Sequence, residues 1–271
     1  MWEILLPIFG FLIGIAASLT GIGGGIFIVP ILTILYSFVP QTAIGTSLTA
    51  IIFTAVASTL NYAKQKRIYY KTGLILAVTT APGAYLGAWL TTIIKPNELG
   101  FIFGVFLILV SIRMLFDSNP FKRKSSKNQE KLESPKAMSD YELVKSGKTL
   151  ALGAGLSFFG GLASGLLGIG GGVLVVPIMT FAMSMPIHFA TATSMFTMIF
   201  TSISGVTKHF QANQINFEYA ILLAFGTIFG AQVGAYTSKK ISSKNLRRIF
   251  AVMLIIAGIK MIDQYKIVLG F

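Results

Sequence analysis

The chain alternates between long apolar stretches and short polar junctions. Three stretches carry no Asp, Glu, Lys or Arg over about 20 residues or more, at 42–63, 72–94 and 178–206. A helix of about 20 apolar residues is long enough to cross the hydrocarbon core of a membrane. The pattern therefore predicts membrane-spanning helices.

The same pattern divides each half of the chain into five apolar segments. They lie at 4–19, 26–38, 42–63, 72–94 and 99–116, and at 149–166, 173–185, 189–210, 219–238 and 246–262. The second segment of each half, of about 13 residues, is too short to span the membrane easily. We expect an all-α polytopic membrane protein in which the first two segments of each half either cross fully or form a re-entrant hairpin.

An internal repeat relates the two halves. Shifting the sequence by 147 residues places Gly-Ile-Gly-Gly-Gly at 21–25 on the same five residues at 168–172. Further matches follow in the same register: Val-Pro-Ile at 29 and 176, Ile-Phe-Thr at 52 and 199, and Gly-Ala at 83 and 230. Such self-similarity indicates duplication. We predict two transmembrane repeats, 1–116 and 149–271, separated by a polar linker at 117–148.

The basic residues predict how the repeats are oriented. The loop at 64–71, the linker at 117–148 and the loop at 239–248 contain 17 of the 22 Lys and Arg residues. The positive-inside rule assigns all three regions to the cytoplasm. The two repeats then insert in opposite directions, both termini lie outside, and Lys208 and His209 lie at the external interface.

Composition narrows the class of protein. Apolar residues make up 54% of the chain and charged residues 11%, against about 25% charged in soluble domains. The formal net charge of +13 does not indicate a nucleic-acid partner, because the basic residues lie between the apolar segments. There is no cysteine. No carboxylate lies well inside an apolar segment, because Glu3, Glu98, Glu218 and Asp263 all lie near segment ends. We expect no metal, no cofactor and no enzymatic activity.

The two glycine runs predict breaks in the helices. Each Gly costs about 1 kcal/mol relative to Ala inside a helix, so Gly23, Gly24 and Gly25, and likewise 170–172, should open the backbone before a new helix begins. A helix N-terminus attracts an anion, and inverted repeats would bring two such termini together. The alternative is that the glycines allow close helix packing. The candidate glycines of the second run are Gly170, Gly171 and Gly172.

Hydroxyl pairs repeat early in the third segment of each half. Thr46 and Ser47 match Thr193 and Ser194, and their hydroxyls could donate to an oxyanion. The alternative is a hydrogen bond to a carbonyl of their own or a neighbouring helix. Gln232, which lies among small residues in the second half, completes the candidate substrate-binding set.

These motifs resemble those of the TauE/SafE family, also called TSUP permeases. The resemblance rests on the duplicated glycine motif, on Pro30 and Pro177 after it, and on Ala-x-x-Thr-Ser downstream in each half. It covers nearly the whole chain apart from the linker. It implies that the chain transports a small sulfur-containing anion: sulfite, thiosulfate, sulfoacetate or a related sulfonate. It also implies that the glycines and the Thr-Ser pairs bind this substrate.

The expected function is therefore a secondary transporter that works by alternating access in the cell inner (cytoplasmic) membrane. The alternatives are an anion channel and a non-transporting membrane scaffold. The expected partners are the anion and the lipid bilayer. The direction of transport, a coupling proton or ion, and homo-oligomerisation stay open at this point.

Overall fold

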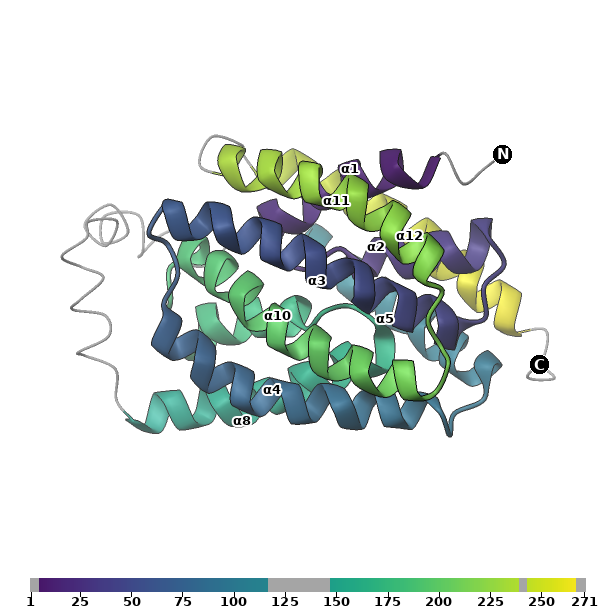
Figure 1. Cartoon of the computed structure of the whole chain (residues 1–271), viewed down its shortest axis with the longest axis horizontal. Coiled ribbons are helices and arrows are strands. Elements are labelled where there is room, and N and C mark those ends of the chain that lie inside the picture. The colour runs from purple at the N-terminus through teal and green to yellow at the C-terminus, as the bar shows by residue number, and fades with distance from the viewer. Residues whose placement is uncertain (1–4, 117–146, 239–242, 267–271) are drawn as a thin grey trace.

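The computed structural model describes residues 5–116, 147–238 and 243–266 (Figure 1). Of the predicted linker at 117–148, residues 117–146 lie outside the described part. The first half contains α1 (Leu5–Thr20), α2 (Gly25–Pro30), η2 (Ile31–Leu35), α3 (Pro40–Lys64), α4 (Tyr70–Thr91) and α5 (Pro96–Phe116). The second half contains α8 (Gly147–Leu167), α9 (Gly172–Pro177), η4 (Ile178–Ala182), α10 (Ile187–Gln211), α11 (Phe217–Thr237) and α12 (Ser243–Lys266).

The predicted all-α polytopic architecture is confirmed. Among the described residues, five helices are long and apolar enough to cross a membrane: α3, α4, α10 and α11, together with residues 149–167 of α8. Large apolar side chains are exposed along them, such as Val78, Phe225 and Tyr236. In a membrane this surface faces lipid. The predicted second segment of each half is divided, because a short α-helix gives way to a wider π-helical turn after Pro30 and Pro177.

The turns beside the long helices repeat with the sequence. Ser37 and Ser184, which precede α3 and α10, have φ angles of 54° and 52°. Lys66 and Asn213, which follow those helices, both have a φ angle of 54°. Left-handed backbone is uncommon for residues other than glycine. Its recurrence at a separation of 147 residues shows that the local backbone is duplicated along with the sequence.

The helices of one half pack mainly on helices of the other (Figure 1). Helix α1 lies along α11, and α8 lies along α4; α3 contacts α11, and α10 contacts α4. The equivalent helices α3 and α10 contact each other, as do α5 and α12. Small residues permit the close approaches: a Cβ added at Gly226 of α11 would collide with the carbonyl of Pro7. The two halves are thus interleaved around a shared centre.

Candidate functional site

Two helical hairpins approach the centre of the bundle, and each turns at a glycine run. In the first, Gly21, Gly23 and Gly24 have φ angles of 74°, 96° and 87°. In the second, Gly168, Gly170 and Gly171 have φ angles of 69°, 79° and 86°. These angles suit glycine and few other residues. The predicted helix breaks are confirmed, and Gly24 and Gly171 are the residues that precede α2 and α9.

The two breaks contact each other through a reciprocal set of interactions. Ser47 of α3 donates a hydrogen bond of 2.9 Å to the carbonyl oxygen of Gly168, and Ser194 of α10 donates one of 2.9 Å to that of Gly21. Gly25 packs on the Gly168 carbonyl and Gly172 packs on the Gly21 carbonyl, so closely that a Cβ at either glycine would collide. Each break is therefore held by the glycine run of the other half and by the long helix of that half, which is α3 or α10. We call this contact the glycine clasp.

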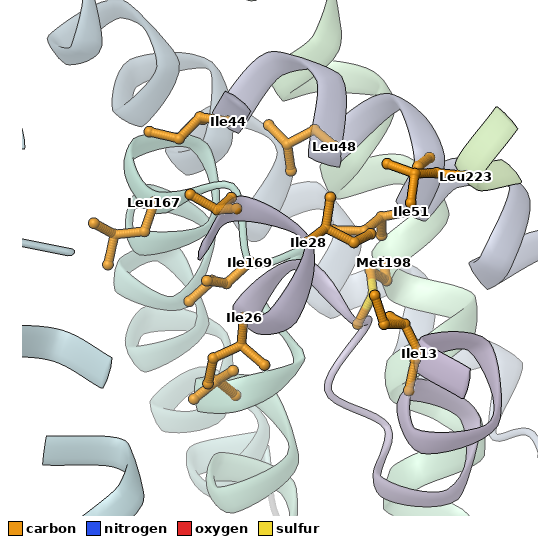
Figure 2. Packing of buried hydrophobic residues seen from close by; sticks show 14 of the residues in the cluster. Ile13, Ile26, Ile28, Ile44, Leu48, Ile51, Leu167, Ile169, Met198 and Leu223 are labelled. Carbon is orange, nitrogen blue, oxygen red and sulfur yellow. The ribbon is translucent and has the colours of Figure 1, made fainter. Parts of the chain in front are cut away.

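Apolar side chains fill the space between the breaks. Met198 of α10 is 1% exposed, and a Cβ added to Gly170 would lie 2.9 Å from its Sδ. A Cβ added to Gly172 would lie 2.7 Å from its Cε. Ile51, the matching residue of α3, also borders Gly170. Figure 2 shows Met198 and Ile51 within the apolar core. The clasp is closed in this conformation.

The two breaks differ in what surrounds them. A Cβ added to Gly24 would lie 2.7 Å from Cγ2 of Ile13, whereas one added to Gly171 would find Ser164 and Thr201 at 3.5 and 3.6 Å. Ser164 is fully buried, and its Oγ has no hydrogen-bond partner among the described residues. A buried polar atom without a partner calls for an explanation. The second break is therefore the less tightly packed of the two and has a buried hydroxyl without a partner beside it.

Two of the predicted hydroxyls lie away from the breaks. Thr46 Oγ1 accepts a hydrogen bond of 3.0 Å from the N–H of Asn216, just before α11. Thr193 Oγ1 accepts one of 3.1 Å from the N–H of Tyr69, just before α4. Both threonines are fully buried. Of the four predicted hydroxyls, the structure therefore brings only Ser47 and Ser194 to the glycine clasp.

Gln232 also lies away from the breaks, in a chain of hydrogen bonds between α3 and α11. Its Nε2 donates to the carbonyl of Ala57 at 2.8 Å, and its Oε1 accepts from Asn61 at 3.0 Å. Asn61 in turn accepts from Gln65 at 2.9 Å, and Gln65 accepts from Arg67 at 3.1 Å. We call these four side chains the polar ladder.

The sequence does not reveal the ladder, because Gln65 and Arg67 stand out there only as part of a basic loop. The residues that match the ladder through the repeat are Tyr85 in the first half and Lys208, Ala212 and Gln214 in the second. They form no equivalent chain in the described part. The signal available in the sequence is the difference between the halves at matched positions, such as Asn61 against Lys208 and Tyr85 against Gln232. It indicates Gln232 as a candidate but does not indicate that these residues bond to one another.

The described residues form a helical bundle with duplicated halves and five helices long and apolar enough to cross a membrane, an arrangement typical of multi-pass membrane transporters. Comparison with known proteins supports this. The family described as "Sulfite exporter TauE/SafE" matches residues 6–261. The chain belongs to this family.

Relatives of the chain are named as transporters. It is 35% identical to the "Probable membrane transporter protein YunE" of Bacillus subtilis, over 96% of this chain and 97% of the relative. It is 30% identical to a "Probable membrane transporter protein" of Methanocaldococcus jannaschii, over 95% and 94%. A Xylella fastidiosa protein with the same description is 27% identical over 93% and 92%. No solved structure matches the chain significantly.

Proposed function

We propose that the chain is a secondary transporter that moves a small sulfur-containing anion across the cytoplasmic membrane by alternating access. The anion is sulfite, thiosulfate, sulfoacetate or a related sulfonate. The family description, which refers to sulfite export, supports this class of substrate. The names of the relatives support membrane transport.

The proposal includes halves that insert in opposite directions. Thr46 near the start of α3 bonds to Asn216 beyond the end of α10, and Thr193 near the start of α10 bonds to Tyr69 beyond the end of α3. The equivalent helices α3 and α10 therefore run antiparallel. This is what inverted repeats require. With the basic loops inside, the linker is cytoplasmic and both termini are external.

The glycine clasp is the observation that carries the proposal. Each half holds the break of the other through one serine and one glycine contact, so a rocking motion of the halves must rearrange both breaks together. Alternating access in inverted-repeat transporters uses such a motion around a central site. We propose that the anion binds there, chiefly at the second break, where the buried Ser164 hydroxyl, which has no partner among the described residues, can donate to it.

The packed centre favours a carrier over an open pore. Met198 fills the space between the breaks and is almost completely buried. An anion that passes must displace this side chain, and the flexible thioether is suited to moving. The conformation described here is then one in which the centre between the breaks is closed.

Flux measurements on purified protein in proteoliposomes test the proposal. Radiolabelled sulfite, thiosulfate and sulfoacetate are offered separately at fixed gradients. We expect saturable flux of at least one anion, together with exchange between labelled and unlabelled substrate. An ohmic anion current without saturation would replace the carrier by a channel. Absence of flux for every anion would contradict transport and favour the alternative of a non-transporting membrane scaffold.

A further inference from the structure

The long helices form two groups that do not coincide with the sequence halves. Helix α11 of the second half packs on α1 and α3, and helix α4 of the first half packs on α8 and α10. In Figure 1, α1, α3 and α11 lie above α10, α4 and α8, and α3 meets α10 between them. We call these sets the α11 group and the α4 group. Helices α5 and α12 pack mainly on each other and belong to neither group.

Backbone contacts join α11 to α1 and α4 to α8. A Cβ added to Gly230 of α11 would collide with the carbonyl of Phe11, and one added to Gly83 of α4 would collide with the carbonyl of Phe158. These two contacts correspond in the repeat. At such points no side chain lies between the two backbones. A backbone cannot move aside as a side chain can, so these helix pairs resist sliding.

Hydrogen bonds join α11 to α3 and α4 to α10. In the α11 group this is the polar ladder. In the α4 group the hydroxyl oxygens of Thr80 and Thr201 lie 2.8 Å apart, and Ser204 donates a hydrogen bond of 2.6 Å to the carbonyl of Ala81. A shift within either group would leave buried polar groups without partners, which is costly.

A matched contact joins the last pair of helices in each group. Tyr62 of α3 donates a hydrogen bond of 2.6 Å to the carbonyl of Ser18 in α1. His209 of α10 corresponds to Tyr62, and its Nε2 lies 3.3 Å from the carbonyl of Gly165 in α8, which corresponds to Ser18. A neutral imidazole can donate from Nε2 to this carbonyl. Each group is therefore connected internally between all three of its helices.

The boundary between the groups is packed with apolar side chains. A Cβ added to Gly205 of α10 would lie 3.0 Å from Cδ1 of Leu48 in α3, and Ile51 of α3 and Met198 of α10 both border Gly170. Such side chains can change rotamer without giving up a hydrogen bond. The two serine hydrogen bonds of the glycine clasp cross this boundary. The boundary is therefore the place where the bundle can open with least loss.

We infer that α4 and α11 change sides in the proposed rocking motion: α11 moves with the first hairpin and α3, and α4 moves with the second hairpin and α10. The units that rock against each other are then the α11 group and the α4 group. This inference rests on the proposed transport by alternating access. If each half moved with all of its own helices, α4 would have to separate from α10 and α11 from α3.

Two engineered disulfides that share one cysteine separate these motions. The chain has no cysteine of its own. A Cβ added to Gly205 would lie 3.9 Å from the Cβ of Ala84 in α4, within the range of about 3.5–4.5 Å that disulfides require. Ala84→Cys with Gly205→Cys therefore links the two halves inside the α4 group. Leu48→Cys with Gly205→Cys links the two halves across the boundary between the groups.

Exchange of radiolabelled sulfoacetate in proteoliposomes is measured for each double variant after oxidation and again after reduction. Sulfoacetate is the probe because sulfite cleaves disulfides. We expect the oxidised Ala84–Gly205 variant to keep its exchange and the oxidised Leu48–Gly205 variant to lose it until it is reduced. Reversible loss of exchange in the Ala84–Gly205 variant overturns the inference, and so does exchange that persists in both oxidised variants.

A second pair tests the same group without oxidation. Tyr85 of α4 and Gln211 of α10 are exposed, and their side-chain oxygens lie 3.3 Å apart. In Tyr85→Cys with Gln211→Cys, a short bifunctional maleimide forms thioethers that withstand sulfite, so sulfite and thiosulfate also serve as probes. The bridged protein should exchange as fast as protein treated with a monofunctional maleimide, and loss of exchange on bridging alone overturns the inference. Absence of exchange for every anion in the parent protein would instead refute the proposed function, and the inferred motion with it.

Discussion

Single residues at the breaks are constrained in two separate ways. Gly24 and Gly171 are required by their left-handed backbone. Gly25 and Gly172 have no such φ angle and are required by the carbonyl that packs on them. The first constraint is local, and the sequence predicts it. The second depends on the opposite half, so no local pattern could reveal it.

The glycine clasp can be tested by adding one methyl group to Gly172. In Gly172→Ala, the new Cβ would collide with the Gly21 carbonyl, so we expect a drop of several degrees in melting temperature, corresponding to about 1–3 kcal/mol, and loss of flux. Gly155→Ala in α8 is the control, because a Cβ there meets nothing within 4 Å. This control should keep its flux and gain up to about 1 kcal/mol from helix propensity. Equal melting temperatures and flux in both variants would contradict the glycine clasp.

Met198 allows a test of the closed centre. Met198→Ala should cost about 2–5 kcal/mol of stability, as expected for a buried cavity, but should raise the flux of sulfoacetate relative to sulfite, because the space between the breaks widens. Met261→Ala is the control: this methionine of α12 is equally buried and contacts Thr33 instead of the breaks. It should lose stability without changing selectivity. A shift of selectivity in both variants would mean that general loosening is responsible.

At the scale of elements, the sequence predicts where the helices lie along the chain better than it predicts which helices pack on each other. Apolar runs and glycine breaks are local signals, and they predict the long helices and the two hairpins. The division at Pro30 is missed, because an apolar run does not distinguish an α-helix from a π-helical turn. Thr46 and Thr193 are predicted to face a ligand. Instead, Thr46 of α3 accepts a hydrogen bond from the N–H of Asn216, which follows the end of α10, and Thr193 of α10 accepts one from the N–H of Tyr69, which follows the end of α3. Such pairings follow from the interleaving of the halves.

The polar ladder predicts that Gln232 stabilises the contact between α3 and α11 more than the matched Tyr85 stabilises the contact between α10 and α4. Gln232→Leu removes the bonds to Ala57 and Asn61. Because it leaves buried polar groups without partners, we expect a loss of about 1–3 kcal/mol, measured as a lower melting temperature. Tyr85→Phe at the matched position removes one exposed contact of 3.3 Å and should be almost neutral. Similar losses of stability in the two variants would contradict a polar ladder that exists between α3 and α11 alone.

At the scale of the whole molecule, the two ends of the bundle are built alike but differ in their polar side chains. Each end ties the tip of a hairpin to the end of a long helix, through Tyr62 at one end and His209 at the other. The ladder reinforces the Tyr62 end with a chain of hydrogen bonds, whereas His209 at the other end contacts Gln214 and the Gly165 carbonyl. The proposed alternating access would use both ends as gates, and the different side chains would then control each end separately.

The orientation of these ends in the membrane gives the last prediction. Lys64 and Gln211 end α3 and α10, correspond in the repeat and are both exposed. In intact cells, a membrane-impermeant maleimide should label Gln211→Cys, and it should label Lys64→Cys only after permeabilisation, because the basic loop after α3 stays in the cytoplasm. The opposite result would keep the halves inverted but exchange inside and outside. Labelling of both variants from the same side would refute the inverted repeat, and with it the shared central site on which alternating access depends.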